Sequence, residues 1–307
     1  MSDLYKQSAA HVMVMEPAGF HSNPETRESN SYQHDDPDNV NVVQAAAAEE
    51  FRVYRDKLVS ENIAVTTVLG RMESPDDVFC NNWVSTHRDA DGNGQIVLYP
   101  MLAPNRRLER RTDMLGLLGK MYDTALDLSA SEAQGIALEA TGCLAMDRVN
   151  KVAYMTRSAR MDEGLAQKFA DTMGYELVMF NTMNHAGKPV YHTDVMLYFG
   201  TGYAGICADA IVPEDRERVM ERLFDGGKRE LVEISMDQLR SFCGNSLQLI
   251  DADGKPVLAM SSAAHAAYSE SQKATLLKYI DRIVHSDLHT IEKYGGGSAR
   301  CMLLEMF

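Results

Sequence analysis

The chain has 307 residues, of which 45 % are hydrophobic and 24 % are charged, and its formal net charge is −14. These values are typical of a globular protein, while the acidic balance argues against binding to nucleic acid or to an anionic membrane surface. No apolar run approaches the roughly 20 residues of a membrane helix, and the first residues lack the basic start and long apolar core of a signal peptide.

The cysteines are scattered and odd in number, and no two of them form a CxxC pair. This usage argues against a disulfide framework or a zinc site, and it predicts reduced thiols in a cytoplasmic protein. The five cysteines are Cys80, Cys143, Cys207, Cys243 and Cys301.

Local patterns near the N-terminus predict a strand, a long loop and a helix. Residues 11–15 (HVMVM) predict a short strand. A stretch rich in Asn, Ser, Asp and Pro follows, and because loops of this length are usually functional or disordered, residues 20–38 are a candidate lid. Apolar residues near helical spacing then predict a helix over 41–62.

One pattern recurs through the rest of the chain. Polar turns flanked by two β-rich runs predict hairpins within 81–100, 142–158, 194–210 and 246–261. Helices are predicted between them, over 107–123, 160–174, 213–227 and 269–284. The hairpin–helix unit repeats about every 60 residues, so some five units fill the chain. Because neither end shows a distinct capping repeat, a closed ring fits better than an open solenoid.

Polar residues stand where the chain leads into these hairpins and into its last segment. If the units surround an axis, equivalent positions converge on it, and one cleft would combine a thiol, an imidazole and several carboxylates or amides. The residues are Asn81, Asn82, Glu139, His192, Asp194, Asn245 and Cys301.

Each of these residues also has a purely structural interpretation. A single cysteine is more often a buried small hydrophobe than a nucleophile. However, glycines precede Cys301, and SARCMLLEM can begin a helix whose N-terminus would lower the pKa of the thiol. His192 and Asp194 would share one face of a strand, and Glu139 is a carboxylate inside an apolar segment.

Several motifs together carry a resemblance that spans nearly the whole chain. They are GFHSNPET, NSYQ, PDDVFCNNWVSTH, IVLYPMLAPNRRLERR, LEATGCLAMDR, VYHTDVMLYFGTG and GSARCMLLEMF. The chain resembles the pentein superfamily of guanidine-modifying enzymes, and within it most closely the bacterial citrulline-utilisation hydrolases. The resemblance implies a five-bladed α/β propeller with pseudo-fivefold repeats, in a single catalytic domain over residues 1–307. It further implies a small amino-acid substrate, a homo-oligomer, and neither a cofactor nor a metal.

The resemblance also assigns roles to individual residues. Cys301 matches the nucleophile, His192 the general acid/base and Glu139 the carboxylate that steadies the histidine or the substrate. The substrate contacts that it implies, together with the polar residues of the candidate lid, are Asn81, Asn82, Asp194, Arg160, Arg107, Asn30 and Gln33. Arg160 resembles the arginine that binds the α-carboxylate of the substrate. For Arg107, the charged start of a helix explains the surrounding segment equally well.

Two classes of substrate are compatible with these residues. A neutral ureido group needs a hydrogen-bond donor, and amides stand at Asn81 and Asn82, which favours the hydrolysis of citrulline to ornithine, carbon dioxide and ammonia through an S-carbamoyl enzyme. Asp194 also suits a guanidinium cation, so an arginine deiminase, another guanidino hydrolase or an amidinotransferase stays open. A non-enzymatic binding module is disfavoured by the joint presence of Cys301, His192 and Glu139.

Overall fold

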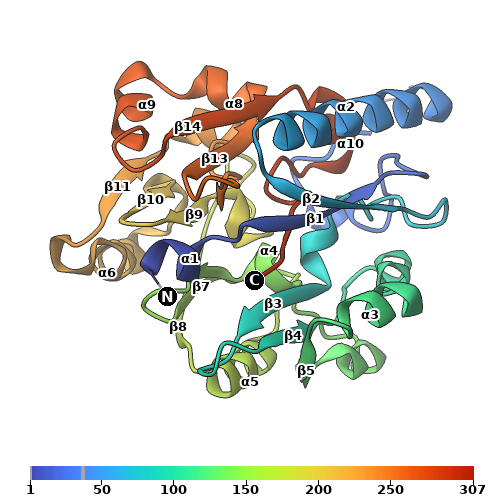
Figure 1. Ribbon diagram of the computed structural model, residues 1–307, viewed down its shortest axis with the longest axis horizontal. Helices are drawn as coiled ribbons and strands as arrows, with labels where there is room; N and C mark the ends of the chain where they lie inside the picture. Colours follow the sequence, from blue (N-terminus) through green and yellow to red (C-terminus); the bar gives the residue numbers. More distant parts are fainter. Residues whose placement is uncertain (1, 36–38) are drawn as a thin grey trace.

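Five small sheets of three strands each are arranged around a common centre (Figure 1). The computed structural model describes residues 2–35 and 39–307. In every sheet the middle strand pairs antiparallel with one neighbour and parallel with the other. The predicted fold class, a five-bladed mixed α/β architecture, is thereby confirmed.

Four of the blades come from the four predicted hairpins, each followed by a parallel outer strand. Short polar turns close the hairpins, and Gly92, Gly202 and Gly254 adopt positive φ there, which side chains other than glycine rarely tolerate. The strands are β3 Val84–Arg88, β4 Gly94–Leu98, β5 Asp123–Asp127, β6 Ala145–Asp147, β7 Val152–Thr156, β8 Glu176–Phe180, β9 Leu197–Gly200, β10 Tyr203–Ile206, β11 Glu230–Glu233, β12 Leu247–Ile250, β13 Pro256–Ser261 and β14 Arg282–Ser286.

The fifth blade joins the two ends of the chain. Strand β1 (His11–Glu16) pairs parallel with β2 (Ala64–Leu69) and antiparallel with β15 (Leu304–Glu305). In Figure 1 the C-terminal segment ends near the centre of the molecule, close to β1. The prediction that a helix begins around Cys301 is wrong, because these residues form a turn and then enter strand β15.

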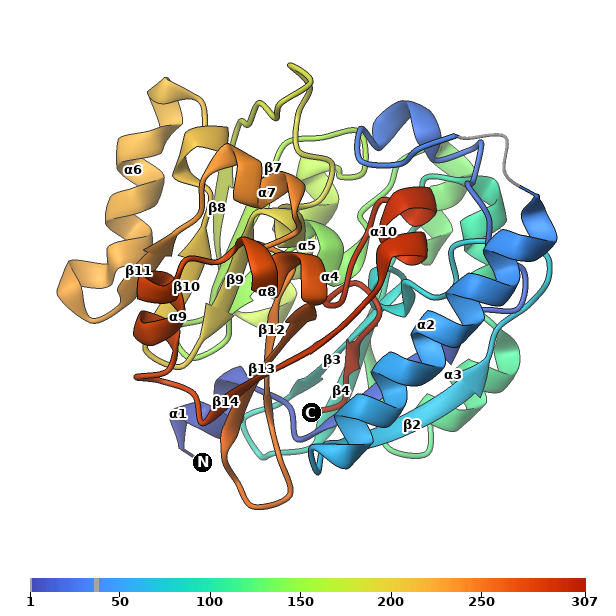
Figure 2. The ribbon, with the colours of Figure 1, turned by 90° about the horizontal axis from the view of Figure 1, so that it is seen from above.

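Helices cover the outer strands. In α2 (Val40–Ser60) the buried residues Val43, Ala47, Phe51, Tyr54 and Leu58 share one face, which packs against β1, β2 and β14. Figure 2 shows α2 along one side of the molecule with α10 beside it. The remaining α-helices are α1 Asp3–Gln7, α3 Thr112–Leu118, α4 Ala140–Cys143, α5 Glu163–Met173, α6 Pro213–Phe224, α7 Met236–Arg240, α8 Ser262–Ala267, α9 Glu270–Leu276 and α10 His289–Gly295.

Two predicted helices are shorter than the sequence pattern suggested. The segment predicted over 107–123 contains only α3, because a 3-10 turn, η3 (Pro104–Glu109), precedes it and strand β5 begins at Asp123. Similarly, the segment 269–284 holds α9 and then enters β14. No helix in the described part of the chain is long and apolar enough to cross a membrane.

Short helical turns lead into the hairpins, and they position the site. The turns η2 (Cys80–Asn82), α4 and η5 (Thr193–Val195) precede β3, β6 and β9, and α4 contacts both of the others. Their residues are buried. The predicted convergence of the hairpin lead-ins is therefore present in the structure. The other 3-10 turns are η1 Arg27–Ser29, η4 Ser129–Gln134, η6 Ala208–Ala210 and η7 Asp225–Gly227.

Candidate active site

Cys301 lies in the turn between α10 and β15, and its side chain is buried against two other hairpin lead-ins. Its Sγ atom is 3.1 Å from Nδ2 of Asn245 and 3.5 Å from Oδ2 of Asp194. The chain reaches this position through Gly296, whose φ of +64° is left-handed and whose missing Cβ would lie 2.6 Å from the Asn30 side chain. The glycines before the cysteine thus allow the loop to pack closely, as the sequence suggested.

The electrostatic surroundings of the thiol differ from the prediction. Burial raises the pKa of Cys301 well above its ordinary value, and the Asp194 carboxylate raises it further. The amide of Asn245 and the guanidinium of Arg300 act in the opposite direction. The expected lowering of the thiol pKa by a helix N-terminus is wrong, because no helix begins here. In the free protein Cys301 is therefore a neutral thiol near pH 7.

His192 and Glu139 form a buried pair. The Nε2 atom of His192 is 2.8 Å from Oε2 of Glu139, which also accepts a hydrogen bond from Arg160 at 2.8 Å. Burial alone would raise the carboxyl pKa of Glu139, but Arg160, His192 and Arg106 outweigh burial and hold that pKa well below its usual range. Burial lowers the pKa of His192 despite the opposing effect of Glu139, so its imidazole is neutral at pH 7.

The backbone beside this pair shows strain and close packing. Ala140, directly after Glu139, has a φ of +34°, which is unusual for a residue with a Cβ. A Cβ on Gly142 would lie 2.4 Å from Oδ1 of Asn82 and 2.7 Å from Nδ1 of His192. Only a glycine at this position lets the amide and the imidazole approach α4 together.

The side-chain amides of Asn81 and Asn82 are each oriented by a hydrogen-bond acceptor. Nδ2 of Asn81 donates to Oδ2 of Asp194 at 3.1 Å, and Nδ2 of Asn82 donates to the carbonyl of Phe79 at 3.3 Å. Because only the nitrogen of an amide can face these acceptors, both Oδ1 atoms point elsewhere. Among the described residues, neither Oδ1 atom has a hydrogen-bond partner, and the same holds for Oδ1 of Asp194, whose pKa is raised by burial.

A small cavity is lined by Cys301, His192, Asn82, Arg160 and Asn30 of the predicted residues, whereas Glu139, Asn81 and Asp194 do not line it. Its volume is about 10 Å³, on the scale of a single water molecule, so an amino acid enters only if the surrounding segments move. Asp76, which the sequence analysis did not single out, lines this cavity, and its Oδ1 atom has no partner within residues 2–35 and 39–307. The lining residues are Thr26, Asn30, Asp76, Phe79, Asn82, Arg106, Arg160, Tyr191, His192, Gly295, Gly297 and Cys301.

Arg160 and Arg106 line the cavity, whereas Arg107 does not. Arg160 is 1 % exposed and bonds Glu139, Oγ of Ser29 and the carbonyl of Thr26, so it stabilises the Glu139–His192 pair from the cavity wall. Arg107 does not reach the cavity, because its guanidinium donates to the carbonyls of Met101 and Leu102. Its neighbour Arg106 lines the cavity instead.

The polar N-terminal loop covers the site. Nδ2 of Asn30 donates to the carbonyl of Gly295, which links this loop to the glycines before Cys301. Gln33 does not line the cavity, and its Oε1 accepts a hydrogen bond from Thr26 at 3.0 Å. Of the candidate lid over 20–38, residues 36–38 lie outside the described residues.

The sequence contained a signal for Asp76 and a weaker one for Tyr191. Asp76 belongs to an acid pair, PDDVF, five residues before Asn81, and carboxylates so close to a predicted site are candidates for it. Tyr191 precedes His192, and its ring lies 4.5 Å from the imidazole, while its hydroxyl donates to the carbonyl of Gly296 at 2.6 Å.

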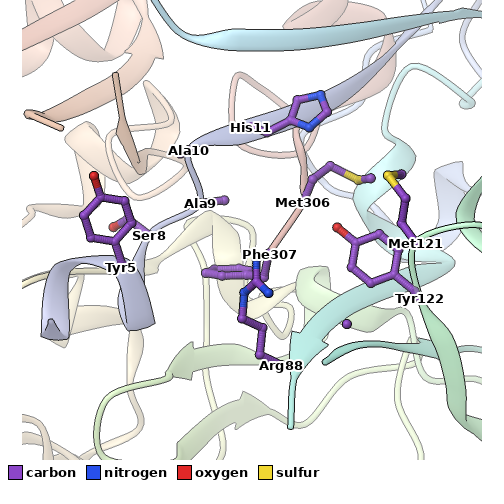
Figure 3. A pocket seen from close by; sticks show the side chains of 11 residues that line it. Tyr5, Ser8, Ala9, Ala10, His11, Arg88, Met121, Tyr122, Met306 and Phe307 are labelled. Atoms are coloured by element: carbon purple, nitrogen blue, oxygen red, sulfur yellow. The ribbon is translucent and has the colours of Figure 1, made fainter. Parts of the chain in front are cut away.

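A more open cleft lies at the other end of the blade that β3, β4 and β5 form. Strand β3 starts beside Asn82 and ends at Arg88, which lines this cleft of about 420 Å³. Figure 3 shows Arg88 there with His11, Tyr122 and Phe307. Neither the thiol nor the imidazole described above reaches the cleft, so we place the candidate site in the smaller cavity.

One family model matches the chain over almost its whole length. The family model described as N,N dimethylarginine dimethylhydrolase, eukaryotic, matches residues 16–307. The chain belongs to this family. The predicted membership in the pentein superfamily is thereby confirmed. A sequence comparison with curated proteins gives no match.

Solved structures show the same fold at low sequence identity. The N-terminal domain of ArgZ, an arginine dihydrolase from cyanobacteria, has a TM-score of 0.75 and 17 % identity over 97 % of both chains. Unliganded AgrE has a TM-score of 0.76 and 16 % identity over 97 % of this chain, which spans only 39 % of AgrE. A dimethylarginine dimethylaminohydrolase in an adduct with S-methyl-L-thiocitrulline has a TM-score of 0.66 and 17 % identity, over 97 % of this chain and 100 % of that one.

Proposed function

We propose that the protein is a cysteine hydrolase that cleaves a C–N bond in the guanidino group of a small amino acid such as arginine. The observation that carries the proposal is the group of buried oxygen acceptors that surrounds the thiol of Cys301. Within the described part of the chain, no donor reaches the buried Oδ1 atoms of Asp76 and Asn82, which line the cavity. The same holds for Oδ1 of Asp194, which lies against Cys301, and for Oδ1 of Asn81, whose nitrogen donates to Asp194. A guanidinium carries five N–H donors and a positive charge, and it satisfies such acceptors. The family and the solved arginine dihydrolase support this substrate class.

Cys301 is the nucleophile in this proposal. Its thiol proton passes to the neutral imidazole of His192, and the sulfur attacks the trigonal guanidino carbon, so that a C–S bond forms. The resulting imidazolium gives its proton to the departing nitrogen, and the C–N bond breaks with release of ammonia or an amine. His192 then takes a proton from water, which attacks the adduct, and the C–S bond breaks to restore the thiol and release a ureido product.

Glu139 keeps the imidazole ready for both steps. Because its carboxylate accepts the hydrogen bond from Nε2 of His192, Nδ1 remains the basic atom, and the negative charge stabilises the imidazolium that forms. A bound guanidinium also favours ionisation of Cys301, because a cation beside a thiol lowers its pKa and offsets the effect of Asp194.

Citrulline is the second candidate substrate. The pair Asn81–Asn82 has amides rather than two acids, which suits a neutral ureido group. However, each of the two amide nitrogens already gives one of its two N–H groups to a protein acceptor, whereas neither Oδ1 atom has a partner in the described part of the chain. For this reason we rank citrulline behind a guanidino substrate, and hydrolysis of citrulline to ornithine would be a second use of the same residues.

The decisive experiment compares substrates directly. Purified protein is incubated with L-arginine, an N-methylated arginine or L-citrulline, and citrulline, ornithine, ammonia and methylamine are quantified. We expect turnover of a guanidino compound, and a covalent adduct on Cys301 in acid-quenched samples by mass spectrometry. Cys301→Ala is the control and should give neither. Turnover of citrulline alone would favour the second candidate, whereas no turnover and no adduct with any of the three would contradict the proposal.

We also propose a reducing, cytoplasmic environment, because all five cysteines are unpaired and buried. The oligomeric state and the extent of the single domain stay predictions of the sequence. Sedimentation equilibrium of the purified chain would test the predicted homo-oligomer.

A further inference from the structure

We infer that Asn245 is a positioning residue that holds the Cys301 thiolate and lowers the free energy of its formation. The inference rests on the proposed function in taking Cys301 as the nucleophile. Asn245 is fully buried, and its Nδ2 atom donates to Sγ of Cys301 at 3.1 Å. It stands in the short lead-in to β12, on a different blade from both His192 and Cys301.

One amide group connects the three parts of the chain that meet at the sulfur. Nδ2 of Asn245 also donates to the backbone carbonyl of Asp194 at 3.0 Å. Its Oδ1 accepts the backbone N–H groups of Arg300 at 3.0 Å and of Cys301 at 3.3 Å. The acceptor side thus fixes the loop, and because the oxygen is occupied by N–H donors, the nitrogen must face the sulfur.

The backbone around Asn245 is shaped for this contact. A Cβ on Gly244 would lie 2.2 Å from the carbonyl oxygen of Val195, so only glycine lets this segment press against the turn that carries Asp194. Phe242 has a φ of +58°, a rare conformation for a bulky residue, and its carbonyl accepts the backbone N–H of Asn245 at 2.9 Å. Strain of this kind persists where the surrounding structure enforces it, often at functional sites.

The donor matters because the other neighbours disfavour a thiolate. Burial and Asp194 both raise the pKa of Cys301, while the Asn245 amide lowers it. A hydrogen bond to a charged acceptor is stronger in the protein interior than in water, so it stabilises the thiolate more than the thiol. Asn245 therefore acts through Cys301 and through the position of its loop, without touching the substrate.

The test uses Asn245→Asp, which keeps the side-chain shape and the acceptor for the loop but replaces the donor with a carboxylate oxygen. The pH dependence of Cys301 alkylation by iodoacetamide is followed by peptide mass spectrometry, so the measurement needs no substrate. We expect the apparent pKa of Cys301 to rise by at least about one unit, which is a tenfold lower thiolate fraction at a given pH. On the proposed substrate, kcat should fall about 10–100-fold with little change in KM.

Gln248→Glu is the matched control. Gln248 is a buried amide three residues further on, and it donates to Ser8 and Thr201, away from the thiol. An equal shift in both variants, or no shift in Asn245→Asp, would overturn the inference. If Asn245→Asp melts too early to assay, Asn245→Leu removes the donor at similar volume without adding a charge, and an unchanged alkylation profile there would overturn the inference as well. A shift in alkylation in a protein that turns over no guanidino compound would contradict only the proposed function.

Discussion

Replacing Glu139 by glutamine should destabilise the protein and remove most of its activity. The carboxylate has no exposed surface and accepts from three donors, namely Nε2 of His192, the guanidinium of Arg160 and the backbone N–H of Leu102. A glutamine NH₂ would have to face one of these donors, and Arg160 would lose its buried counter-ion. Removing one partner of a buried ion pair typically costs about 3–5 kcal/mol.

The difference in stability between wild type and Glu139→Gln should decrease as the pH falls. Because the pKa of Glu139 in the folded protein lies well below its ordinary value, the ionised group stabilises the fold above the unfolded pKa, and this contribution is lost as the pH falls toward the folded pKa. With an unfolded pKa of about 4.3, the advantage of wild type over Glu139→Gln should shrink by about 1 kcal/mol between pH 6 and pH 3.5.

Urea unfolding followed by tryptophan fluorescence measures both effects, because Trp83 is the sole tryptophan and is fully buried next to Asn82. Glu132→Gln is the control, since Glu132 likewise pairs with an arginine, Arg110, and accepts a backbone N–H, but its side chain is 12 % exposed and lies outside the cavity. We expect kcat to fall about 10³–10⁴-fold in Glu139→Gln alone, as when a carboxylate that orients a catalytic histidine becomes an amide. Equal urea midpoints and activities in the two variants would refute the reasoning.

Three further predictions concern the same site. Asp194→Asn removes a negative charge beside the sulfur, so Cys301 should be alkylated faster at pH 8. The kcat/KM for a guanidino substrate should nevertheless fall at least about tenfold, and slower alkylation would contradict the assigned effect of Asp194. Gly142→Ala places a methyl group against Asn82 and His192, so activity should drop to near background with a small change in melting temperature; full activity would mean that the two groups need not approach α4. Because burial lowers the pKa of His192, the acidic limb of the kcat/KM profile should lie below about pH 6.5, and a limb above that value would show that His192 is not the group responsible.

The sequence predicted the blades better than their closure. Hairpins are local, so polar turns between β-rich runs were sufficient to locate four of the five sheets. The fifth sheet depends on Val12 pairing with Glu305 and Met13 with Leu304, residues at opposite ends of the chain. Nothing within a local window distinguishes such a strand from a helix start, and the segment after Cys301 was accordingly predicted as helical.

The site was predictable to the extent that it follows the repeat. Cys301, His192 and Asn82 occupy equivalent lead-ins and meet at one cavity. Neighbouring residues in an irregular turn point in different directions, which explains why Arg106 lines the cavity and Arg107 does not. Likewise, the presence of Asn81 and Asn82 was visible in the sequence, but the direction of their nitrogens depends on acceptors from other segments.

The charge of the substrate connects these observations. In the free protein, burial and the Asp194 carboxylate both keep Cys301 protonated, so the nucleophile is not formed in advance. A guanidinium brings a positive charge to the same place and lowers the free energy of the thiolate at the moment when it is needed. A ureido group brings no such charge, and the amide nitrogens of Asn81 and Asn82 that would bind its carbonyl each already give one of their two N–H groups to a protein acceptor. The same sulfur should therefore react faster with arginine than with citrulline, and a kcat/KM that is higher for citrulline would show that substrate charge does not activate the thiol.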